Sequence, residues 1–389
     1  MKYNVNDQIP KETDLIVLGS GAAGMSAALT GAALGYQVTL IEKTDKIGGT
    51  SARSAGSLWI PNTFLDKTGK DNFQNSLIYL KNAIGNKFDL ERIEKFLKAG
   101  PEMVKFLDKK SFVKLRAYDH HPDYLAKLEG ATLSGRVLEP HPYNASVLGK
   151  HFKDIRLPLP EFMLFNGLMV DRVDISHLMK LTKSIKSFIH SVKILCCYLI
   201  DVIKFGRGTR LVMGNALVGR LYQSLLSYNV NIICSADVKS LIYKNNKVSE
   251  VSITSNNKIN RIKVNAGVIL ATGGFSNNKK LRKKLIPQTI PKESCVLESA
   301  TGDGINLAEK LGGRLKISDE SNSFFAPISL KKRNDNSTAV FPHFVLDRGK
   351  PGLVAVNPNG KRFVNEATTY HLFGKALSKV LKKYPNRSC

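Results

Sequence analysis

The sequence predicts an α/β fold in which a parallel sheet, helices and a small antiparallel ladder form one domain and a shorter α+β domain follows. Three adjoining patterns predict it. Residues 14 to 18, "DLIVL", form an apolar run bounded by polar residues and glycine, which is typical of a buried parallel strand. Small and apolar residues at helical spacing follow in "AAGMSAALTGAALGY", and "QVTLIEK" has a second strand pattern. Together they predict a βαβ unit of about thirty residues.

The next element is helical. From 74 to 109 apolar residues recur three and four positions apart, and Pro101 is expected to begin a new turn. Residues 116 to 205 are expected to form an excursion from the domain. Its first part, 116 to 175, is rich in Pro, Gly and His and is predicted to be irregular.

Strand patterns resume at 231 to 254 and at 260 to 274. Asn245 and Asn246 separate two β-rich runs and predict a hairpin turn between them. The resulting antiparallel ladder is expected to lead into a buried strand, "GVILA", within the second range.

Two apolar stretches of the excursion allow more than one interpretation. Residues 178 to 205 are amphipathic and basic, which fits an ordinary packed helix or a helix that lies on a membrane surface. Their longest uncharged apolar run, "ILCCYLI", is far shorter than the roughly 20 residues of a membrane span. Residues 157 to 170, "LPLPEFMLFNGLMV", fit an apolar substrate entrance and a buried core equally well.

The composition is strongly basic, with 58 Lys plus Arg against 32 Asp plus Glu and a net charge of +26. Such a charge attracts polyanions. The basic residues are nevertheless spread along the chain, without aromatic interleaving or a zinc-finger, RNP or basic-heptad pattern. We therefore attribute the charge to a Lys-rich and Asn-rich composition and predict no nucleic-acid partner; an anionic membrane surface remains an alternative.

Compartment and metal content follow from the N-terminus and the cysteines. The first residues are polar and lack the pattern of a secretory signal, so the cytoplasm is the expected compartment, with peripheral membrane contact through 178 to 205 as the alternative. None of the five cysteines forms a CxxC pair, and free, buried thiols are expected. The sequence predicts no metal site.

A glycine motif follows the first predicted strand. Gly19, Gly21 and Gly24 form G-x-G-x-x-G at the start of the helix. The first glycine permits a tight turn, the second lets the backbone approach a pyrophosphate, and the third lets helix and strand pack closely. The helix N-terminus then meets the phosphate with free N–H groups and the positive end of its dipole.

An acidic residue and a second glycine cluster strengthen this interpretation. Glu42 ends the second strand, where a carboxylate accepts hydrogen bonds from adenosine ribose hydroxyls. Behind it, "KIGGTSARSAGSLWIP" contains Gly48, Gly49, Thr50 and Ser51. A nicotinamide-binding domain needs nothing special at that point, whereas small residues with exposed N–H and hydroxyl groups suit a chain that passes closely along a flavin.

In combination, these motifs resemble a known family along essentially the whole chain. G-S-G-A-A-G, "EK", "GGTSARSAG", "VILATGGF" (268 to 275) and "TGDGINLAEKLGG" (301 to 313) are similar to the fumarate reductase and succinate dehydrogenase type flavoproteins. Residues 341 to 377, which include "NEATTY", resemble the 3-ketosteroid dehydrogenase branch of that superfamily.

The resemblance implies a non-covalent FAD, because the histidine that tethers flavin in succinate dehydrogenases has no counterpart here. It also implies a Rossmann-like FAD-binding domain over 1–317, with the excursion at about 116–205, and a catalytic domain over 318–389. T-G-D-G also fits a helix N-terminus capped by Asp303. The residues assigned to the cofactor by motif and resemblance are Gly19, Ser20, Gly21, Ala22, Ala23, Gly24, Glu42, Lys43, Gly48, Gly49, Thr50, Ser51, Gly56, Val238, Ala271, Thr272, Gly273 and Asp303.

The resemblance further supplies two catalytic tyrosines. Tyr370 of "NEATTY" matches the family's base, and Tyr124 of "HPDY" matches the tyrosine that supports it through a hydrogen bond. The implied reaction takes a small apolar ketone, steroid-like in kind: the base removes the α proton, flavin N5 takes the hydride, and an electron acceptor later reoxidises the flavin. A phenol is a weak base in water, so the site is expected to stabilise the phenolate.

The sequence departs from the family at one point. In family members a C-terminal tyrosine and a glycine N–H stabilise the enolate, and neither appears before "KKYPNRSC". The catalytic domain is therefore expected to be truncated and incomplete. This leaves open whether the chain is active by itself, and it fits the first half of a split or frameshifted gene, a decayed remnant or one part of a two-chain enzyme.

Alternative functions stay open beside this one. They are a steroid 4-ene dehydrogenase, a fumarate-type reductase that uses Arg348 and His343, and a degenerate protein that binds FAD without turnover. The sequence lacks G-x-S-x-G, G-x-x-x-x-G-K-[ST] and H-E-x-x-H, so it disfavours a hydrolase, a P-loop NTPase and a zinc protease.

Overall fold

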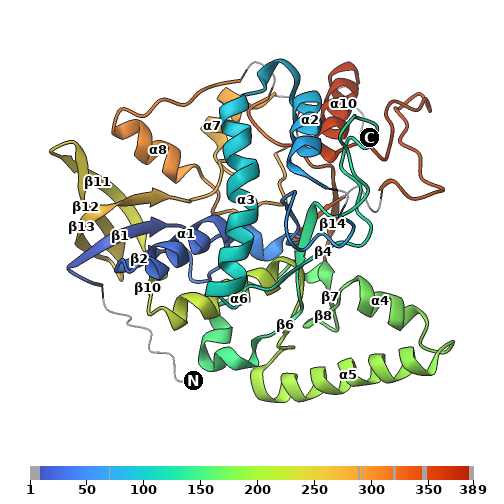
Figure 1. The fold of residues 1–389 in the computed structure, drawn as a ribbon, viewed down its shortest axis with the longest axis horizontal. Coiled ribbons are helices and arrows are strands. Elements are labelled where there is room, and N and C mark those ends of the chain that lie inside the picture. The colour runs from blue at the N-terminus through green and yellow to red at the C-terminus, as the bar shows by residue number, and fades with distance from the viewer. Residues whose placement is uncertain are drawn as a thin grey trace. The chain divides into compact units, whose positions relative to one another are not determined.

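The computed structural model describes residues 9–69, 71–287, 290, 292–318, 321–343 and 348–384 (Figure 1). The chain divides into two compact units. The first comprises Met1–Pro122 and Glu129–Gly273, and the second comprises Asp123–Leu128 and Gly274–Cys389. The functional boundary expected between residues 317 and 318 stays a prediction.

The first unit is built on a six-stranded sheet of order β10-β2-β1-β13-β12-β11. Strands β10, β2, β1 and β13 are parallel neighbours, while β12 and β11 add an antiparallel ladder. The predicted mixture of parallel sheet and antiparallel ladder is confirmed. The strands are β1 (Glu12–Leu18), β2 (Val38–Ile41), β10 (Asn231–Ile233), β11 (Asp237–Lys244), β12 (Lys247–Ser255) and β13 (Lys258–Leu270).

The βαβ unit forms as predicted. Helix α1 (Ala22–Ala33) connects β1 to β2, whose register pairs Leu18 with Ile41. Val17 and Leu29 are fully buried in the hydrophobic core that includes both the sheet and the helix. The helix lies close to the sheet because Gly31 has no side chain there: a Cβ would stand 2.8 Å from Leu15 Cδ2.

Helix α6 (Met213–Ser227) is buried along most of its length and packs against α1. Its residues Leu217, Leu221 and Leu225 belong to the hydrophobic core. This helix was not predicted from the sequence. A helix that is covered on nearly every side has no polar face, so it lacks the amphipathic pattern that reveals most helices.

The hairpin between β11 and β12 is confirmed, because Asn245 and Asn246 adopt the left-handed conformation with φ of 50° and 63°. The prediction that "GVILA" is buried was wrong, because Gly267, Val268 and Ala271 are only partly buried and the other two residues are exposed. Ile269 is 36% exposed and Leu270 38% exposed. The pairing of β12 with β13 ends at Lys263, so among the described residues the last part of β13 pairs with β1 alone.

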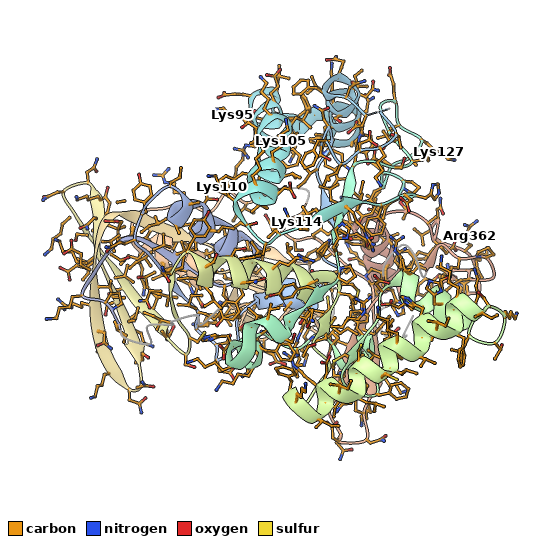
Figure 2. The ribbon with its side chains drawn as sticks, turned by 60° about the horizontal axis from the view of Figure 1, so that its bottom comes forward. Lys95, Lys105, Lys110, Lys114, Lys127 and Arg362 are labelled. Atoms are coloured by element: carbon orange, nitrogen blue, oxygen red, sulfur yellow. The ribbon has the colours of Figure 1, made fainter. Side chains whose placement is uncertain are left out.

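Helices α2 (Phe73–Ile84) and α3 (Leu90–Lys110) form where helix was predicted, with a short 3₁₀ turn, η2 (Gly85–Lys87), between them. Pro101 lies inside α3 rather than at the start of a helix. Figure 2 shows Lys95, Lys105 and Lys110 at separate positions along α3. Lys95 pairs with Glu91 one turn away, as expected of a solvated helix face.

The excursion contains more structure than predicted, because short strands in it pair with one another and with strands on either side of it. Strands β3 (Leu58–Trp59), β5 (Val137–Pro140) and β4 (Leu115–Ala117) form one small sheet, β6 (Tyr143–Asn144) pairs with β9 (Arg210–Leu211), and β7 (Met163–Leu164) pairs with β8 (Leu168–Met169). Two 3₁₀ segments, η3 (Ala145–Asp154) and η4 (Pro160–Phe162), and helices α4 (Arg172–Met179) and α5 (Ile185–Phe205) complete it.

In the part of the chain that the structure describes, no helix combines the length and apolar character needed to cross a membrane.

The second unit contains helices α7 (Lys279–Leu285), α8 (Asp303–Lys310) and α10 (Tyr370–Lys383). A two-stranded antiparallel sheet, β14 (Ile328–Lys332) with β15 (Thr338–Pro342), accompanies them. Phe373 and Val380 of α10 are buried.

Four cysteines are free thiols, as predicted, and Cys389 lies outside the described residues. Their predicted burial was wrong for Cys196 and Cys197, which are exposed on α5. Cys234 and Cys295 are partly buried, and burial raises the pKa of both thiols, that of Cys234 to about 12.

Candidate functional site

The glycine turn after β1 has the geometry that the motif predicts. Gly19 has φ of +102°, a left-handed conformation that favours glycine, and its N–H donates to the Ile41 carbonyl at 2.8 Å. A Cβ at Gly24 would lie 1.8 Å from the Gly19 carbonyl oxygen. Only glycine at both positions lets the helix start this close to the strand.

The N-terminus of α1 is open toward a ligand. Gly21 is the N-cap and provides no side-chain hydrogen bond, and the first turn contains no acidic residue. A Cβ at Gly21 would meet its nearest atom, Ser51 Oγ, at 3.7 Å. The Ala22 N–H donates to Ser51 Oγ at 3.0 Å. Ala23 is the next residue in the first turn of α1. This arrangement fits a phosphate group that approaches the helix end.

The two glycine clusters meet in the first unit. The 3₁₀ turn η1 (Gly49–Arg53) holds Gly49, Thr50 and Ser51. The Gly48 N–H donates to the Ser20 carbonyl at 3.1 Å and to Ser20 Oγ at 3.0 Å. A Cβ at Gly49 would lie 3.3 Å from the Gly21 Cα. Residues that the sequence placed in two separate motifs thus form one continuous backbone surface.

Glu42 is the acidic centre of this surface and is 7% exposed. Its Oε2 accepts from the Ser20 N–H at 3.0 Å and from Ser20 Oγ at 2.6 Å. Its Oε1 accepts from the Thr44 N–H at 3.0 Å and from Thr44 Oγ1 at 2.8 Å. These bonds fix the carboxylate beside the glycine turn, where a ribose hydroxyl can replace a side-chain donor.

Two supporting residues escaped the sequence analysis. Asn215 of α6 is fully buried, and its Nδ2 donates to the Ala52 carbonyl at 2.7 Å and the Arg156 carbonyl at 3.1 Å. Arg156 in turn donates from Nη2 to Thr44 Oγ1 at 2.6 Å. Together they connect η1 to the Glu42 carboxylate. No local motif marks either residue, because their partners are distant in sequence.

Other residues predicted to bind the cofactor follow β13 or lie on β11 of the first unit. Ala271 follows β13, and its N–H donates to the Leu18 carbonyl at 2.8 Å, which places Ala271, Thr272 and Gly273 beside the glycine turn. Val238 lies on β11 two residues after Ala236, whose N–H donates to the Glu42 carbonyl at 3.1 Å.

Gly56 and Lys43 are the other two predicted residues of this unit. A Cβ at Gly56 would lie 2.6 Å from the Gly214 nitrogen, so its contact is with the start of α6. Lys43 directly follows Glu42 and is half-buried. Close packing against the start of α6 explains why position 56 is a glycine.

Asp303 belongs to the second unit. It is the first residue of α8, and the N-cap is Gly302, in the left-handed conformation with φ of 78°. The expectation that Asp303 is the cap was therefore wrong. Its Oδ1 accepts from Thr301 Oγ1 at 2.7 Å.

The two predicted catalytic tyrosines lie side by side in the second unit, although 246 positions separate them in the sequence. The Tyr124 hydroxyl donates to the Tyr370 oxygen at 2.9 Å, and the rings meet edge to face with centroids 5.4 Å apart. Phe324 contacts the Tyr370 ring in the same manner at 5.2 Å. A donated hydrogen bond stabilises the charge that develops on the Tyr370 oxygen when it loses its proton.

The segment that precedes Tyr370 is held by buried polar contacts. Arg348 is buried, and its guanidinium donates to the carbonyls of His343, Glu366 and Thr368. The Glu366 carboxylate accepts from Arg362 and from the Ala355 N–H. Hydrogen bonds from the Arg362 side chain and the Ala355 N–H lower the pKa of Glu366 to about 2. These contacts define where α10 begins and hence where Tyr370 lies.

The fold and the glycine-lined surface of the first unit define a dinucleotide-binding α/β protein. Comparison with known families gives the particular class: residues 14–389 match the FAD binding domain family, and the chain belongs to that family. Its cofactor is accordingly FAD. The open helix end, the left-handed glycines Gly19, Gly48 and Gly49, and the buried Glu42 fit such a group.

Individual relatives are dehydrogenases of cyclic ketones. The chain is 31% identical over 376 residues to the 4-oxocyclohex-2-ene-1-carboxylate 5-dehydrogenase of Sinomonas cyclohexanicum, covering 96% of this chain and 64% of the relative. It is 33% identical over 380 residues to the 3-oxosteroid 1-dehydrogenase of Mycobacterium tuberculosis, covering 94% of this chain and 65% of the relative. The chain thus spans less than two thirds of the length of these relatives.

A solved structure is similar over nearly the whole chain. It is the 3-ketosteroid delta1-dehydrogenase of Sterolibacterium denitrificans in complex with 1,4-androstadiene-3,17-dione, with a TM-score of 0.85 and 29% identity. The match covers 96% of this chain and 67% of that structure.

Proposed function

We propose that this protein is an FAD-dependent dehydrogenase that introduces a carbon–carbon double bond next to a ring ketone, with 3-ketosteroids as its substrate class. The hydrogen bond of 2.9 Å from Tyr124 to Tyr370 is the observation that carries the proposal. Membership in the FAD-binding family and the similarity to ketone dehydrogenases support it.

In the proposed reaction Tyr370 removes the proton from the carbon next to the ketone. The hydrogen bond from Tyr124 stabilises the phenolate that must form before each cycle, and Phe324 packs against the Tyr370 ring to hold it in place. When bound, FAD supplies a hydride acceptor for the adjacent carbon, and an external electron acceptor then reoxidises it.

We propose that residues of the first unit hold the cofactor. Ser20, Gly21 and the first turn of α1 face the pyrophosphate, and Glu42 accepts hydrogen bonds from the adenosine ribose. Gly48, Gly49, Thr50 and Ser51 form the backbone surface along which the flavin half lies. Asp303, Val238 and Gly273 remain proposed contacts on the strength of the motif alone.

A fumarate-type reductase is the less supported function. That chemistry requires a cationic side chain that is free to bind a carboxylate or deliver a proton. Arg348 instead donates three hydrogen bonds to backbone carbonyls and packs over the Phe373 ring at 4.5 Å, so it has the environment of a positioning residue.

The proposal is tested by steady-state assays of the full chain with FAD and a dye acceptor. The substrates are a 3-ketosteroid that is saturated between carbons 1 and 2, 4-oxocyclohexanecarboxylate, and fumarate with a reduced dye. We expect dye reduction with the steroid and a product lighter by two hydrogens. Replacement of Tyr370 by Phe is expected to lower kcat by about a hundredfold or more, the usual contribution of a general base.

Tyr243→Phe is the matched control, because this tyrosine is exposed on β11 and its hydroxyl contacts Asn246. It is expected to retain full activity. Turnover of fumarate without steroid turnover, or equal activity of the Tyr370→Phe and Tyr243→Phe variants, contradicts the proposal.

A further inference from the structure

Helix α5 leaves a broad apolar face exposed, unlike an ordinary packed helix, while its buried residues are Ser187, Ser191 and Ile194. Ile185, Ile189 and Ile203 are 81%, 61% and 86% exposed. Ser187 and Ser191 are buried on the opposite face. We call the exposed set the apolar face of α5; it consists of Ile185, Phe188, Ile189, Val192, Cys196, Leu199, Ile200 and Ile203.

Hydrogen bonds hold the helix in this orientation. Ser187 Oγ contacts His177 Nδ1 at 3.0 Å, and His190 Nε2 contacts Asp174 Oδ1 at 3.0 Å. Near its C-terminal end, Asp201 Oδ2 accepts from the Thr209 N–H and from Thr209 Oγ1, both at 2.7 Å. These contacts lie along the side of the helix that faces the protein, so they fix which face of α5 is exposed.

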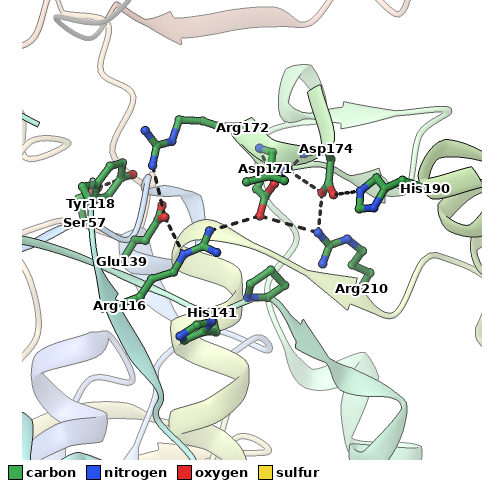
Figure 3. Close-up of polar contacts among 12 residues, drawn as sticks. Ser57, Arg116, Tyr118, Glu139, His141, Asp171, Arg172, Asp174, His190 and Arg210 are labelled. Atoms are coloured by element: carbon green, nitrogen blue, oxygen red, sulfur yellow. Dashed lines mark hydrogen bonds and ion pairs between the residues drawn. The ribbon is translucent and has the colours of Figure 1, made fainter. Parts of the chain in front are cut away.

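The partner of His190 is itself part of an ionic network in the first unit (Figure 3). Asp174 is buried and accepts from Arg210 Nη2 at 2.5 Å. Arg210 lies near Asp171, which also contacts Arg116 at 3.6 Å. Despite burial, hydrogen bonds from the Asp171 backbone and from His190 and Arg210 lower the pKa of Asp174. The inner face of α5 is therefore attached to a charged network through Asp174, whose lowered pKa favours the ionised carboxylate.

Lysines border one side of the apolar face. Lys186, Lys193 and Lys204 are exposed and recur at helical spacing on a single flank, while Lys180 and Lys183 lie just before the helix. A lysine at the edge of an apolar stripe can extend its ammonium group to a lipid headgroup while its methylenes stay near the acyl chains. Phe165 of the β7–β8 turn is also 69% exposed, and its carbonyl accepts from the Tyr198 hydroxyl of α5.

We propose that the apolar face of α5 docks on the surface of an anionic lipid bilayer, with the helix lying in the plane of the interface and its lysine flank on the headgroups. The helix carries four charged residues, Lys186, Lys193, Asp201 and Lys204, so it lies on the bilayer rather than crossing it. The docking does not depend on the proposed reaction.

Charge distinguishes a bilayer from a second copy of the chain as the occupant. Two copies that meet through this face bring two lysine flanks together on molecules of net charge +26 each. An anionic bilayer brings the opposite charge to the same lysines. Electrostatic complementarity therefore favours the lipid surface.

Cosedimentation of the full chain with vesicles tests this proposal. The probes are vesicles of phosphatidylcholine alone and vesicles that contain 30 mol% phosphatidylserine, an amount chosen at roughly the anionic level of a cytoplasmic leaflet. We expect at least tenfold tighter binding to the anionic vesicles, and weaker binding as salt is raised. Sedimentation velocity without vesicles reports whether the chain associates with itself.

Substitutions separate the apolar and the charged contributions. Ile189→Glu with Ile203→Glu is expected to lower vesicle binding more than tenfold, because both side chains enter the interface. Ile259→Glu is the matched control, since Ile259 is 72% exposed on β13 of the same unit. Replacement of Lys186, Lys193 and Lys204 by Gln is expected to lower binding about fivefold per lysine. The equivalent change of Lys95, Lys105 and Lys110 on α3 (Figure 2) is expected to have no such effect.

The adjacent cysteines Cys196 and Cys197 report the orientation of the helix. Cys196 lies four residues from Val192 and from Ile200, on the apolar face, whereas Cys197 lies four residues from Lys193, on the lysine flank. In variants that lack Cys389 and one of these two thiols, we expect anionic vesicles to slow alkylation of Cys196 much more than alkylation of Cys197. Burial raises the pKa of the Cys234 and Cys295 thiols, which keeps their reaction slow.

Three outcomes overturn the proposal. They are binding to anionic vesicles that the Ile189→Glu with Ile203→Glu variant retains, equal protection of Cys196 and Cys197, and a stable dimer that the same two substitutions dissociate. Circular dichroism of each variant confirms that α5 stays folded. Lost binding with retained helix content supports lipid docking.

Discussion

The hydroxyl pair of Tyr124 and Tyr370 is the residue-scale feature on which the proposed chemistry depends. Tyr124 donates to Tyr370 at 2.9 Å within the second unit. One tyrosine then acts on the substrate and the other acts through it. The two side chains are accordingly expected to differ in how strongly their removal affects the rate.

Replacement of Tyr124 by Phe tests this difference. The variant removes the hydrogen bond to the Tyr370 oxygen and keeps the ring. A hydrogen bond to a charged group contributes about 1.5–3 kcal/mol, so kcat is expected to fall roughly 10-fold to 150-fold with little change in KM. A variant that raises KM and leaves kcat unchanged assigns Tyr124 to substrate binding instead.

Glu42 is the residue-scale test of the cofactor site. Glu42→Gln keeps the size of the side chain but replaces one oxygen by an N–H₂ group that cannot accept from Ser20 or Thr44. We expect the affinity for FAD to fall about tenfold to a hundredfold, measured by flavin fluorescence titration. Glu12→Gln, on an exposed side chain of β1, is the control. Unchanged affinity in the Glu42 variant removes Glu42 from the proposed ribose site.

At the scale of elements, α6 supports the turn that carries the second glycine cluster. A Cβ at Gly214 would lie 2.0 Å from the Ser51 carbonyl oxygen, and Asn215 bonds the Ala52 carbonyl. Asn215→Ala leaves two buried carbonyls without this donor, which costs about 2 kcal/mol of unfolding free energy. We expect lower thermal stability together with weaker FAD binding.

Asn260→Ala on β13 serves as the comparison for Asn215, because the Asn260 amide contacts the exposed Lys258 carbonyl. Chemical denaturation and flavin titration give the two readouts. A destabilised Asn215 variant that binds FAD normally shows that η1 keeps its position without this contact.

The segment before α10 makes the second unit sensitive to acid. The pKa of Glu366 is about 2 in the folded chain, below its ordinary value of 4.5, so the folded state binds fewer protons than the unfolded state between these values. Its stabilisation is present above about pH 4.5 and is lost as the pH falls toward 2.

This acid sensitivity is measurable by thermal unfolding from pH 6 to pH 3. We expect Glu366→Gln to lower the unfolding temperature at pH 6 and to reduce its decline with acid. Glu309→Gln on α8 is expected to keep the decline of the wild type. A Glu366→Gln profile parallel to that of the wild type contradicts the role of this carboxylate.

The sequence predicted those elements whose pattern is local. The βαβ unit has period and glycine signals within thirty residues, and the Asn245–Asn246 turn has its own left-handed residues. Helix α6 lacked a polar face, and the exposure of Ile269 depends on where a neighbouring strand stops. Neither the burial of α6 nor the exposure of Ile269 can be predicted from a short stretch of neighbouring residues.

The site was predictable to a similar extent. Gly19, Gly24 and Glu42 follow from the chemistry of phosphate and ribose binding. The pairing of Tyr124 with Tyr370 came from family resemblance, because nothing in the residues themselves links two positions 246 apart. The contacts of Asn215 and Arg156 required the folded chain.

At the scale of the whole molecule, the proposed tasks belong to different units. The glycine surface and Glu42 lie in the first unit, and the tyrosine pair lies in the second. Substitutions in the two units are therefore expected to have separable effects. Glu42→Gln should recover its rate at saturating FAD, whereas Tyr370→Phe should hold FAD normally and remain slow.

The central claim is that Tyr370 removes the proton from a ketone substrate in an FAD protein. Anaerobic mixing of the FAD-saturated chain with a 3-ketosteroid, followed at the visible flavin absorbance, tests it most directly. We predict that the steroid bleaches the flavin of the wild type and that Tyr370→Phe, with the same flavin content, bleaches at least a hundredfold more slowly. A bound flavin that the steroid does not bleach, or one that bleaches equally fast in both proteins, would contradict the claim.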